Sequence, residues 1–421
     1  MISLSYGRSG IVIDHPGNFA VFEPQNVPEI ENPEEAVKHS LINPIGCNSL
    51  SEIVELKKPK KVCIVISDHT RAVPNKMILP AIIDRLKLCG MPDENIFILI
   101  GNGTHRKTTE KEKIELVGEE IIKRFRIYDH CAKDDSDLVR IENSDFFVNR
   151  KYFEADLKIV TGMIEPHFFA GFSGGRKGVC PGIAGMQTMK IFHGAEFLEH
   201  PDTKPGVIEN NKCHAFATEF AKKAGVDFIV NVTINKKGEI TGVFSGDLEK
   251  AFMHGVDFCR KTSTVFSDRK YKIVITTNGG YPLDRDFYQS SKGMVAVLDI
   301  VEEGGIIISA SECCDGIGNE EFKKLLIELK DPDLFIKKIM QPGYFQDLQW
   351  GIQPFVHVLR KARIFLVSGL SHDDAELCKA IPFDNISDAI GAALKEFGEN
   401  TEIAVIPDGP YTIVQLKRSY Q

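Results

Sequence analysis

The run Lys61-Val62-Cys63-Ile64-Val65-Ile66-Ser67, followed directly by Asp68-His69-Thr70-Arg71, decides the predicted fold. A short and nearly continuous apolar run rich in β-branched residues is typical of a strand that is covered on both faces. Seven further runs of this kind occur along the chain, and segments with helical periodicity lie between many of them. These runs cover residues 96–100, 157–161, 228–234, 273–276, 305–309, 364–367 and 403–406.

Strands that alternate with helices predict an α/β fold with mostly parallel sheets flanked by helices. A polar stretch at residues 262–272 indicates a boundary, so we expect an N-terminal cofactor-binding domain (1–270) and a C-terminal α/β domain (271–421) that contributes substrate contacts. The turn Lys236-Lys237-Gly238 predicts an antiparallel hairpin. Helices are expected at 77–89, 184–197, 212–223, 248–260, 285–298, 320–329 and 386–397.

Composition excludes several classes of protein. The chain has 421 residues, 43% of them hydrophobic, and a formal net charge of −8 without a long basic run, which argues against a nucleic-acid partner. No apolar stretch approaches the ~18 residues of a membrane span, so no membrane partner is expected. The N-terminus lacks a signal-peptide pattern, and the ten cysteines form no C-x-x-C pair. We therefore expect reduced thiols and a cytoplasmic protein.

Polar clusters follow the first three predicted strands. Asp68 and Arg71 follow the first strand, His105 follows the second, and His167 follows the third. Open α/β sheets bind ligands beyond the carboxyl ends of their strands. The pattern therefore predicts an active site in a cleft between the two domains.

A glycine-rich loop, Gly171-Phe172-Ser173-Gly174-Gly175-Arg176-Lys177-Gly178, comes next. Glycines allow close approach to an anionic ligand, and a lysine there acts as a charge clamp or a covalent anchor. The loop is neither a Walker A loop nor a G-x-G-x-x-G fingerprint, and a tight turn with Lys177 in solvent is the alternative.

Three histidines are candidates for chemistry. His105 and His167 suit proton transfer near neutral pH, and together they suggest a site with two bases, as racemisation requires. The alternative for each is a loop histidine bonded to the backbone. His193 lies in a predicted helix, where a lone histidine is more often structural than a metal ligand.

Arg71, Gln289 and Lys292 suit anion recognition, and Asp68 suits a supporting role. Arg71 offers a bidentate fork to a carboxylate or phosphate, and Asp68 is suited to orient it or to bind a sugar hydroxyl. Gln289 and Lys292 are three residues apart, so they share one helical face and offer an amide and a cation to a small acid. A salt-bridged turn and a solvated face are the alternatives. Trp350, the single tryptophan, is interpreted as a core or interface aromatic, and a residue that shapes the substrate pocket is the alternative.

These motifs resemble the nickel-dependent lactate racemase family, whose members are nickel-pincer nucleotide 2-hydroxyacid racemases. The likeness runs in order from residue 68 to residue 293. The motifs that carry it are Asp68-His69-Thr70-Arg71, Gly103-Thr104-His105-Arg106, Glu165-Pro166-His167-Phe168 with the loop up to Lys177, His193, and Tyr281-Pro282-Leu283-Asp284 with Tyr288-Gln289-Ser290 and Lys292-Gly293.

The resemblance implies a cofactor, a nickel-pincer nucleotide (Ni(II) pyridinium-3,5-bisthiocarboxylic acid mononucleotide) attached covalently to Lys177 through a thioamide. It implies that His193 ligates the nickel and that accessory proteins build the cofactor. The implied roles of the other residues are acid and base for His105 and His167, cofactor contacts for Asp68, Gly174, Gly175 and Arg176, and substrate contacts for Arg71, Gln289 and Lys292.

The implied reaction is racemisation of lactate by hydride transfer. The α-hydrogen of lactate is a poor acid beside a carboxylate, so its removal as hydride, while a histidine takes the hydroxyl proton, avoids a dianion. Two alternatives remain: a racemase or epimerase for another 2-hydroxy acid, such as malate or a longer aliphatic acid, and a non-catalytic nucleotide- or metal-binding carrier. The sequence lacks the G-x-G-x-x-G fingerprint of a dehydrogenase with dissociable NAD, which argues against that class of enzyme.

Overall fold

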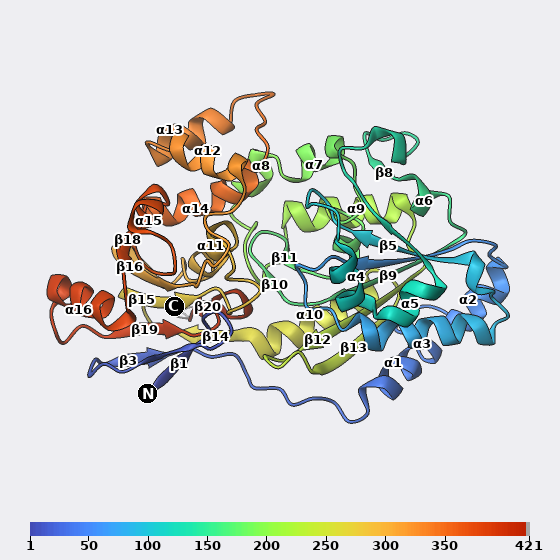
Figure 1. Cartoon of the computed structure of the whole chain (residues 1–421), viewed down its shortest axis with the longest axis horizontal. Helices are drawn as coiled ribbons and strands as arrows, with labels where there is room; N and C mark the ends of the chain where they lie inside the picture. Colours follow the sequence, from blue (N-terminus) through green and yellow to red (C-terminus); the bar gives the residue numbers. More distant parts are fainter. Residues whose placement is uncertain (418–421) are drawn as a thin grey trace.

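The structure, a computed structural model, describes residues 1–417 and contains two six-stranded sheets, one in each half of the molecule (Figure 1). The first sheet has the order β13-β12-β9-β4-β5-β6, in which only β13 is antiparallel to its neighbour. Its strands are β4 (Val62–Ser67), β5 (Ile96–Gly101), β6 (Arg126–Asp129), β9 (Leu157–Met163), β12 (Phe228–Ile234) and β13 (Ile240–Gly246). The hairpin between β12 and β13 confirms the predicted antiparallel turn.

Strand β4 shows why its sequence is apolar throughout. Alternate side chains point to opposite faces of a sheet. Val62 and Ile64 therefore pack on one face against the first three helices, while Cys63 and Val65 pack on the other face against two later helices. The covering helices are α1 (Pro33–Ile42), α2 (Leu50–Lys57) and α3 (Asn75–Leu88) on the first face, and α9 (Lys212–Ala224) and α10 (Lys250–Ser263) on the second.

The second sheet is wholly parallel, with the order β18-β17-β16-β15-β19-β3. Its strands are β3 (Phe19–Val21), β15 (Tyr271–Thr277), β16 (Val301–Ala310), β17 (Ala362–Val367), β18 (Ile381–Phe383) and β19 (Ile403–Ile406). Its helices are α11 (Phe287–Ala296), α12 (Glu320–Glu328), α13 (Pro332–Ile339), α14 (Gln349–Lys361), α15 (His372–Leu377) and α16 (Ile386–Phe397). Helix α16 covers one face and the other helices the opposite one. Two mostly parallel sheets with helices on both faces confirm the predicted fold class.

The first 21 residues lie with the second sheet, although the pattern placed them in the first domain. Strands β1 (Ile2–Leu4) and β2 (Ile11–Ile13) form an antiparallel pair, and β3 pairs with β19. An extended segment then crosses to α1 (Figure 1). The C-terminal strand β20 (Ile413–Leu416) pairs with β14 (Thr264–Ser267). The predicted boundary near residue 270 falls between β14 and β15 and stays a prediction.

The helix predicted at 184–197 is two short helices. These are α7 (Met186–Phe192) and α8 (Ala195–Leu198), and His193 and Gly194 lie between them. His193 therefore stands at a helix end. The remaining strands and helices are α4 (Glu110–Val117), α5 (Glu119–Arg124), α6 (Arg150–Phe153), β7 (Leu138–Arg140), β8 (Phe147–Asn149), β10 (Pro166–His167) and β11 (Gly171–Phe172).

Residues 1–417 contain neither a helix that could span a membrane nor a disulfide. No helix in that range is long and apolar enough to cross a membrane. All ten cysteines of the chain lie within it, and none forms a disulfide.

Candidate active site

The pocket lies where the two halves face each other. Strands β4, β5 and β9 are parallel neighbours, so their carboxyl ends meet at one edge of the first sheet. Helices α11 and α14 of the other half close the opposite side. Nine predicted site residues line this pocket: Asp68, Arg71, His105, His167, Gly174, Lys177, His193, Gln289 and Lys292.

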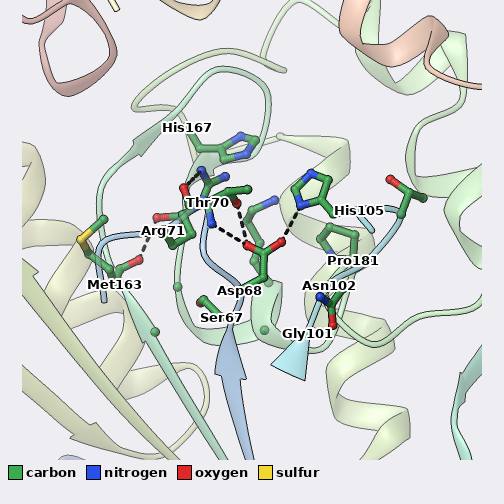
Figure 2. Close-up of a pocket in the computed structure, with 18 of the residues that line it drawn as sticks. Ser67, Asp68, Thr70, Arg71, Gly101, Asn102, His105, Met163, His167 and Pro181 are labelled. Atoms are coloured by element: carbon green, nitrogen blue, oxygen red, sulfur yellow. Dashed lines mark hydrogen bonds and ion pairs between the residues drawn. The ribbon is translucent and has the colours of Figure 1, made fainter. Parts of the chain in front are cut away.

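Asp68 and His105 form a hydrogen-bonded pair at the strand ends (Figure 2). Asp68 Oδ2 lies 2.6 Å from His105 Nδ1, and Oδ1 accepts hydrogen bonds from the Thr70 backbone N–H at 3.1 Å and hydroxyl at 2.6 Å. Burial alone would raise the pKa of Asp68, but the hydrogen bond and charge of His105, with the Thr70 bond, lower that pKa to about 2. Asp68 is therefore a carboxylate that orients His105.

His167 is buried in a strongly cationic environment. Its ring stacks on Phe168 with ring centroids 4.9 Å apart. Nδ1 accepts hydrogen bonds from the backbone N–H groups of Phe169 (3.4 Å) and Ala170 (3.2 Å), so the ring proton lies on Nε2. Burial, followed by the positive charges of Lys177, Arg71, Lys292 and Arg176, lowers the pKa of His167 well below its ordinary value. The ring is neutral before an anionic ligand binds.

Lys177 lies in the 3-10 helix η3 (Gly175–Gly178) within the glycine-rich loop. Its amine lies 5.4 Å from the ring centroid of Phe169 and 5.5 Å from that of Phe192. Burial, then the charges of Arg71 and Arg176, lower the pKa of Lys177 to about 7. A large share of this amine is therefore uncharged at neutral pH, which differs from the alternative of a solvent-exposed lysine.

The glycines of this loop serve packing as well as ligand access. Gly174 has φ +81°, and a Cβ there would lie 2.8 Å from both Asn231 Oδ1 and Ile164 Cγ1. The same Asn231 oxygen accepts the Gly175 N–H at 2.9 Å. These contacts hold the loop against β9 and β12 and leave no room for a side chain at Gly174.

Arg176 and Gly175 do not line the pocket. Arg176 is only 1% exposed, and its guanidinium donates to the Ala170 carbonyl at 2.9 Å and to the Gly174 carbonyl at 3.3 Å. The guanidinium also lies 4.1 Å from the ring centroid of Phe252. Arg176 thus stabilises the loop from the side that faces away from the pocket, a position that differs from the cofactor contact that the resemblance implies for it.

Cations from both halves converge on the pocket. Arg71 Nε lies 3.6 Å from Glu165 Oε1, and Lys292 donates a hydrogen bond to Gln289 on the same face of α11. Burial, then the charge of Arg71, lowers the pKa of Lys292 to about 7 despite opposing carboxylates, Glu165 foremost. Gln289 and Lys292 are half-buried and line the pocket, and their contact with a substrate stays a prediction. The arrangement suits a small anion.

The ring of His193 has one nitrogen without a hydrogen-bond partner among the described residues. The ring stacks on Trp350 with centroids 4.6 Å apart and an interplanar angle of 16°. Its Nδ1 is buried without a hydrogen-bond partner among residues 1–417, and burial lowers the pKa of the ring well below its ordinary value. A neutral imidazole binds metals. No group of three or more histidine, cysteine, aspartate or glutamate side chains that could hold a metal ion exists in that range.

Trp350 and Tyr288 line the pocket, although the sequence favoured a core or interface position for Trp350 and gave Tyr288 no role. Both line the pocket, Trp350 from α14 and Tyr288 from α11. A Cβ at Gly351 would overlap the Tyr288 ring, so the glycine permits this approach. Tyr288 adjoins the predicted Gln289, and that adjacency was a usable signal. Nothing local marks Trp350, because only the tertiary fold brings α14 to His193.

Comparison with known proteins places the chain among racemases. Residues 6–206 match the family model described as "Lactate racemase N-terminal domain", and residues 266–414 match "Lactate racemase C-terminal domain". A lactate racemase from Thermoanaerobacterium thermosaccharolyticum is 36% identical over 99% of both chains. One from Lactiplantibacillus plantarum is 37% identical over 91% of both chains. The lactate racemase apoprotein structure from T. thermosaccharolyticum aligns with TM-score 0.89 and 35% identity over 98% of this chain and 99% of its own.

Proposed function

Because this chain belongs to the lactate racemase family, we propose that it interconverts D- and L-lactate, with His105 and His167 as the acid and base. It is accordingly an enzyme of the isomerase class. The observation that carries the proposal is that both histidines, a buried amine and two cations from opposite halves line one pocket.

His105 is suited to act as a base. Asp68 accepts a hydrogen bond from Nδ1–H, so the Nε2 lone pair is available to the hydroxyl group of a substrate. When His105 takes that proton, the ionised Asp68 stabilises the imidazolium. A positioned proton transfer of this kind contributes roughly 10²–10⁴ in rate.

His167 is suited to the complementary role. The cations around it disfavour its protonated form in the free site. A bound carboxylate neutralises part of that positive charge, which moves the pKa of His167 upward. With its proton on Nε2, the ring is placed to donate a hydrogen bond to a substrate oxygen, which is the part of the acid in the proposed pair.

Arg71, Lys292 and Gln289 are suited to hold the substrate carboxylate. A guanidinium and an ammonium supply charge-assisted hydrogen bonds, and the amide adds direction. A carboxylate fixed at this point leaves C2 free to present either face to the other side of the pocket.

The site fits the implied nickel-pincer nucleotide. Lys177 offers an uncharged amine for covalent attachment, His193 offers one metal ligand, and Gly174 allows close approach of the loop. When bound, the cofactor would accept the C2 hydrogen as hydride and return it. Accessory proteins that assemble the cofactor are its expected partners.

Loaded protein tests the proposal. The chain is produced together with cofactor-assembly proteins, incubated with pure L- or D-lactate, and assayed by chiral chromatography, with malate and 2-hydroxybutyrate in parallel. Lactate is expected to reach equal amounts of both enantiomers. His105→Ala and His167→Ala should each abolish interconversion while the covalent mass addition persists, and Lys177→Ala should lose that addition. Near-normal turnover in either histidine variant would refute the two-base assignment.

A further inference from the structure

Helix α14 presents three side chains on one face to residues 193–199 of the other half. Trp350, Gln353 and His357 are spaced by three and four residues, so they lie along one side of the helix. Trp350 stacks on His193. Gln353 Nε2 donates to the Ala195 carbonyl at 3.0 Å. The face therefore contacts both ends of this segment.

Glu199 is the acceptor at the far end of the segment. Its Oε1 accepts a hydrogen bond from Gln353 Nε2 at 2.7 Å and lies 2.8 Å from His357 Nε2. Burial would raise the pKa of Glu199, but the hydrogen bonds of His357 and Gln353 lower it overall. The group is thus a carboxylate whose hydrogen bonds are charge-assisted, which are the stronger kind.

The segment has little regular structure to orient it. Helix α7 ends at Phe192, Gly194 separates it from α8, and α8 has only four residues. A single turn of helix contributes little stability by itself. The His193 ring contacts Phe169 and Phe192 of its own half edge-on, with centroids 5.6 and 4.8 Å apart, and the stacked contact that fixes the plane of the ring comes from Trp350 of α14.

We propose that Glu199, bound by Gln353 and His357, is a positioning residue that fixes residues 193–199 against α14 and holds the His193 ring on Trp350. The part of this inference that concerns metal rests on the proposed function. Groups that orient a metal ligand commonly change metal affinity by about 10- to 100-fold when they are removed. Contact between the two halves would then set the orientation of the metal ligand.

Trp350 provides a direct measurement, because it is the only tryptophan in the chain. Burial keeps the emission of an indole at short wavelength, and exposure to water moves it to longer wavelength. In the protein without cofactor, Glu199→Ala should shift the emission to longer wavelength, toward the signal of His193→Ala. Glu199→Gln keeps an acceptor oxygen and should stay near wild type.

Matched variants separate positioning from general loss of structure. His357→Leu removes one of the two Glu199 partners and should change the emission in the same direction, by less. Asp384→Ala removes the partner of His372, an exposed pair 3.2 Å apart in the same half, and should change nothing. Circular dichroism monitors the fold. Wild-type emission in folded Glu199→Ala and His357→Leu would overturn the proposal.

Cofactor-loaded protein gives the second measurement, nickel per chain after dialysis against a chelator. Glu199→Ala should retain about tenfold less nickel than wild type, with the KM for lactate nearly unchanged because Arg71 and Lys292 are untouched. If wild type holds nickel but racemises nothing, while Glu199→Ala loses nickel and shifts the emission, the proposed function fails and the positioning role stands. If wild type racemises lactate and Glu199→Ala keeps both its nickel and wild-type emission, the positioning role fails.

Discussion

At the scale of single residues, burial and charge set the protonation states that the proposed chemistry needs. Lys177 and Lys292 have pKa values lowered to about 7, chiefly by burial, and Asp68 has one lowered to about 2 by its hydrogen bonds. The sequence indicated the residue types but not these states, because each state depends on neighbours from other strands and helices.

The lowered pKa of Lys177 predicts unusual reactivity toward amine reagents. Because burial and nearby cations disfavour the charged form, the fraction of Lys177 in the reactive neutral form grows as pH rises through about 7. An exposed lysine is half neutral only at about pH 10.4. Competitive acylation of the protein without cofactor, followed by peptide mass mapping, should show half-maximal labelling of Lys177 near pH 7. A midpoint at the pH that is ordinary for an exposed lysine would contradict this expectation.

Asp68→Asn tests whether Asp68 orients His105 or contacts the cofactor. The amide cannot supply the charge that holds His105 Nδ1–H and stabilises the imidazolium, so kcat for lactate should fall by roughly 10²–10⁴. The covalent mass addition on Lys177 should remain. Thr70→Val, which removes only the hydroxyl bond to Asp68, should cost much less activity. Loss of cofactor with unchanged kcat per loaded chain would favour the contact that the sequence predicted.

At the scale of elements, strands were predicted best where a continuous apolar run is buried on both faces. Strands β12 and β19 match their predicted ranges in full. The helix predicted at 184–197 breaks at His193-Gly194. The prediction missed this break because the apolar periodicity of the sequence continues through it. Helix α14 was not predicted at all, although it carries Trp350.

Gly293→Ala tests how closely α11 must approach strand β15 of the second sheet. A Cβ at Gly293 would overlap the Thr277 carbonyl, so the helix carrying Gln289 and Lys292 would have to shift. Overpacking of this kind typically costs about 1–3 kcal/mol. We expect a loss of that size in urea unfolding and a raised KM for lactate.

Gly391→Ala provides the matched control. Gly391 lies within α16, and a Cβ there would contact nothing within 4 Å. Alanine favours helix over glycine by about 1 kcal/mol, so this variant should be as stable as wild type or more so. Equal stability of the two variants would show that a Cβ at Gly293 fits between α11 and β15 without displacing the helix.

At the scale of the whole molecule, chain crossings and polar contacts join the halves. Residues 1–21 belong with the second sheet, and the extended segment that follows is held to the first half by the Ile30 N–H, which donates to the Ile240 carbonyl at 2.9 Å. Asp408 is buried, pairs with Lys236 of the β12–β13 turn, and accepts a hydrogen bond from the Ser5 hydroxyl at 2.7 Å.

Lys236→Ala should destabilise the protein by roughly 1–3 kcal/mol, because it leaves the Asp408 carboxylate buried with less compensation. The double variant Lys236→Ala/Asp408→Asn should recover part of that loss, since the uncompensated charge is gone. Urea unfolding measures both. Lys237→Ala is the control, because this neighbouring lysine forms no ion pair within residues 1–417. If Lys236→Ala proves no less stable than Lys237→Ala, the pair contributes nothing.

The amino-acid order alone determined the strands, the polar clusters after them and the family resemblance, because each is written in short stretches of neighbouring residues. Tertiary structure decided three features of the site: His105 bonds to Asp68, Arg176 lies on the side of its loop that faces away from the pocket, and Trp350 stacks on His193. Residues far apart in the chain meet there only after two sheets and their helices have packed. Hydrogen bonds and charge interactions act over a few ångströms of space, which residue spacing along the chain does not encode.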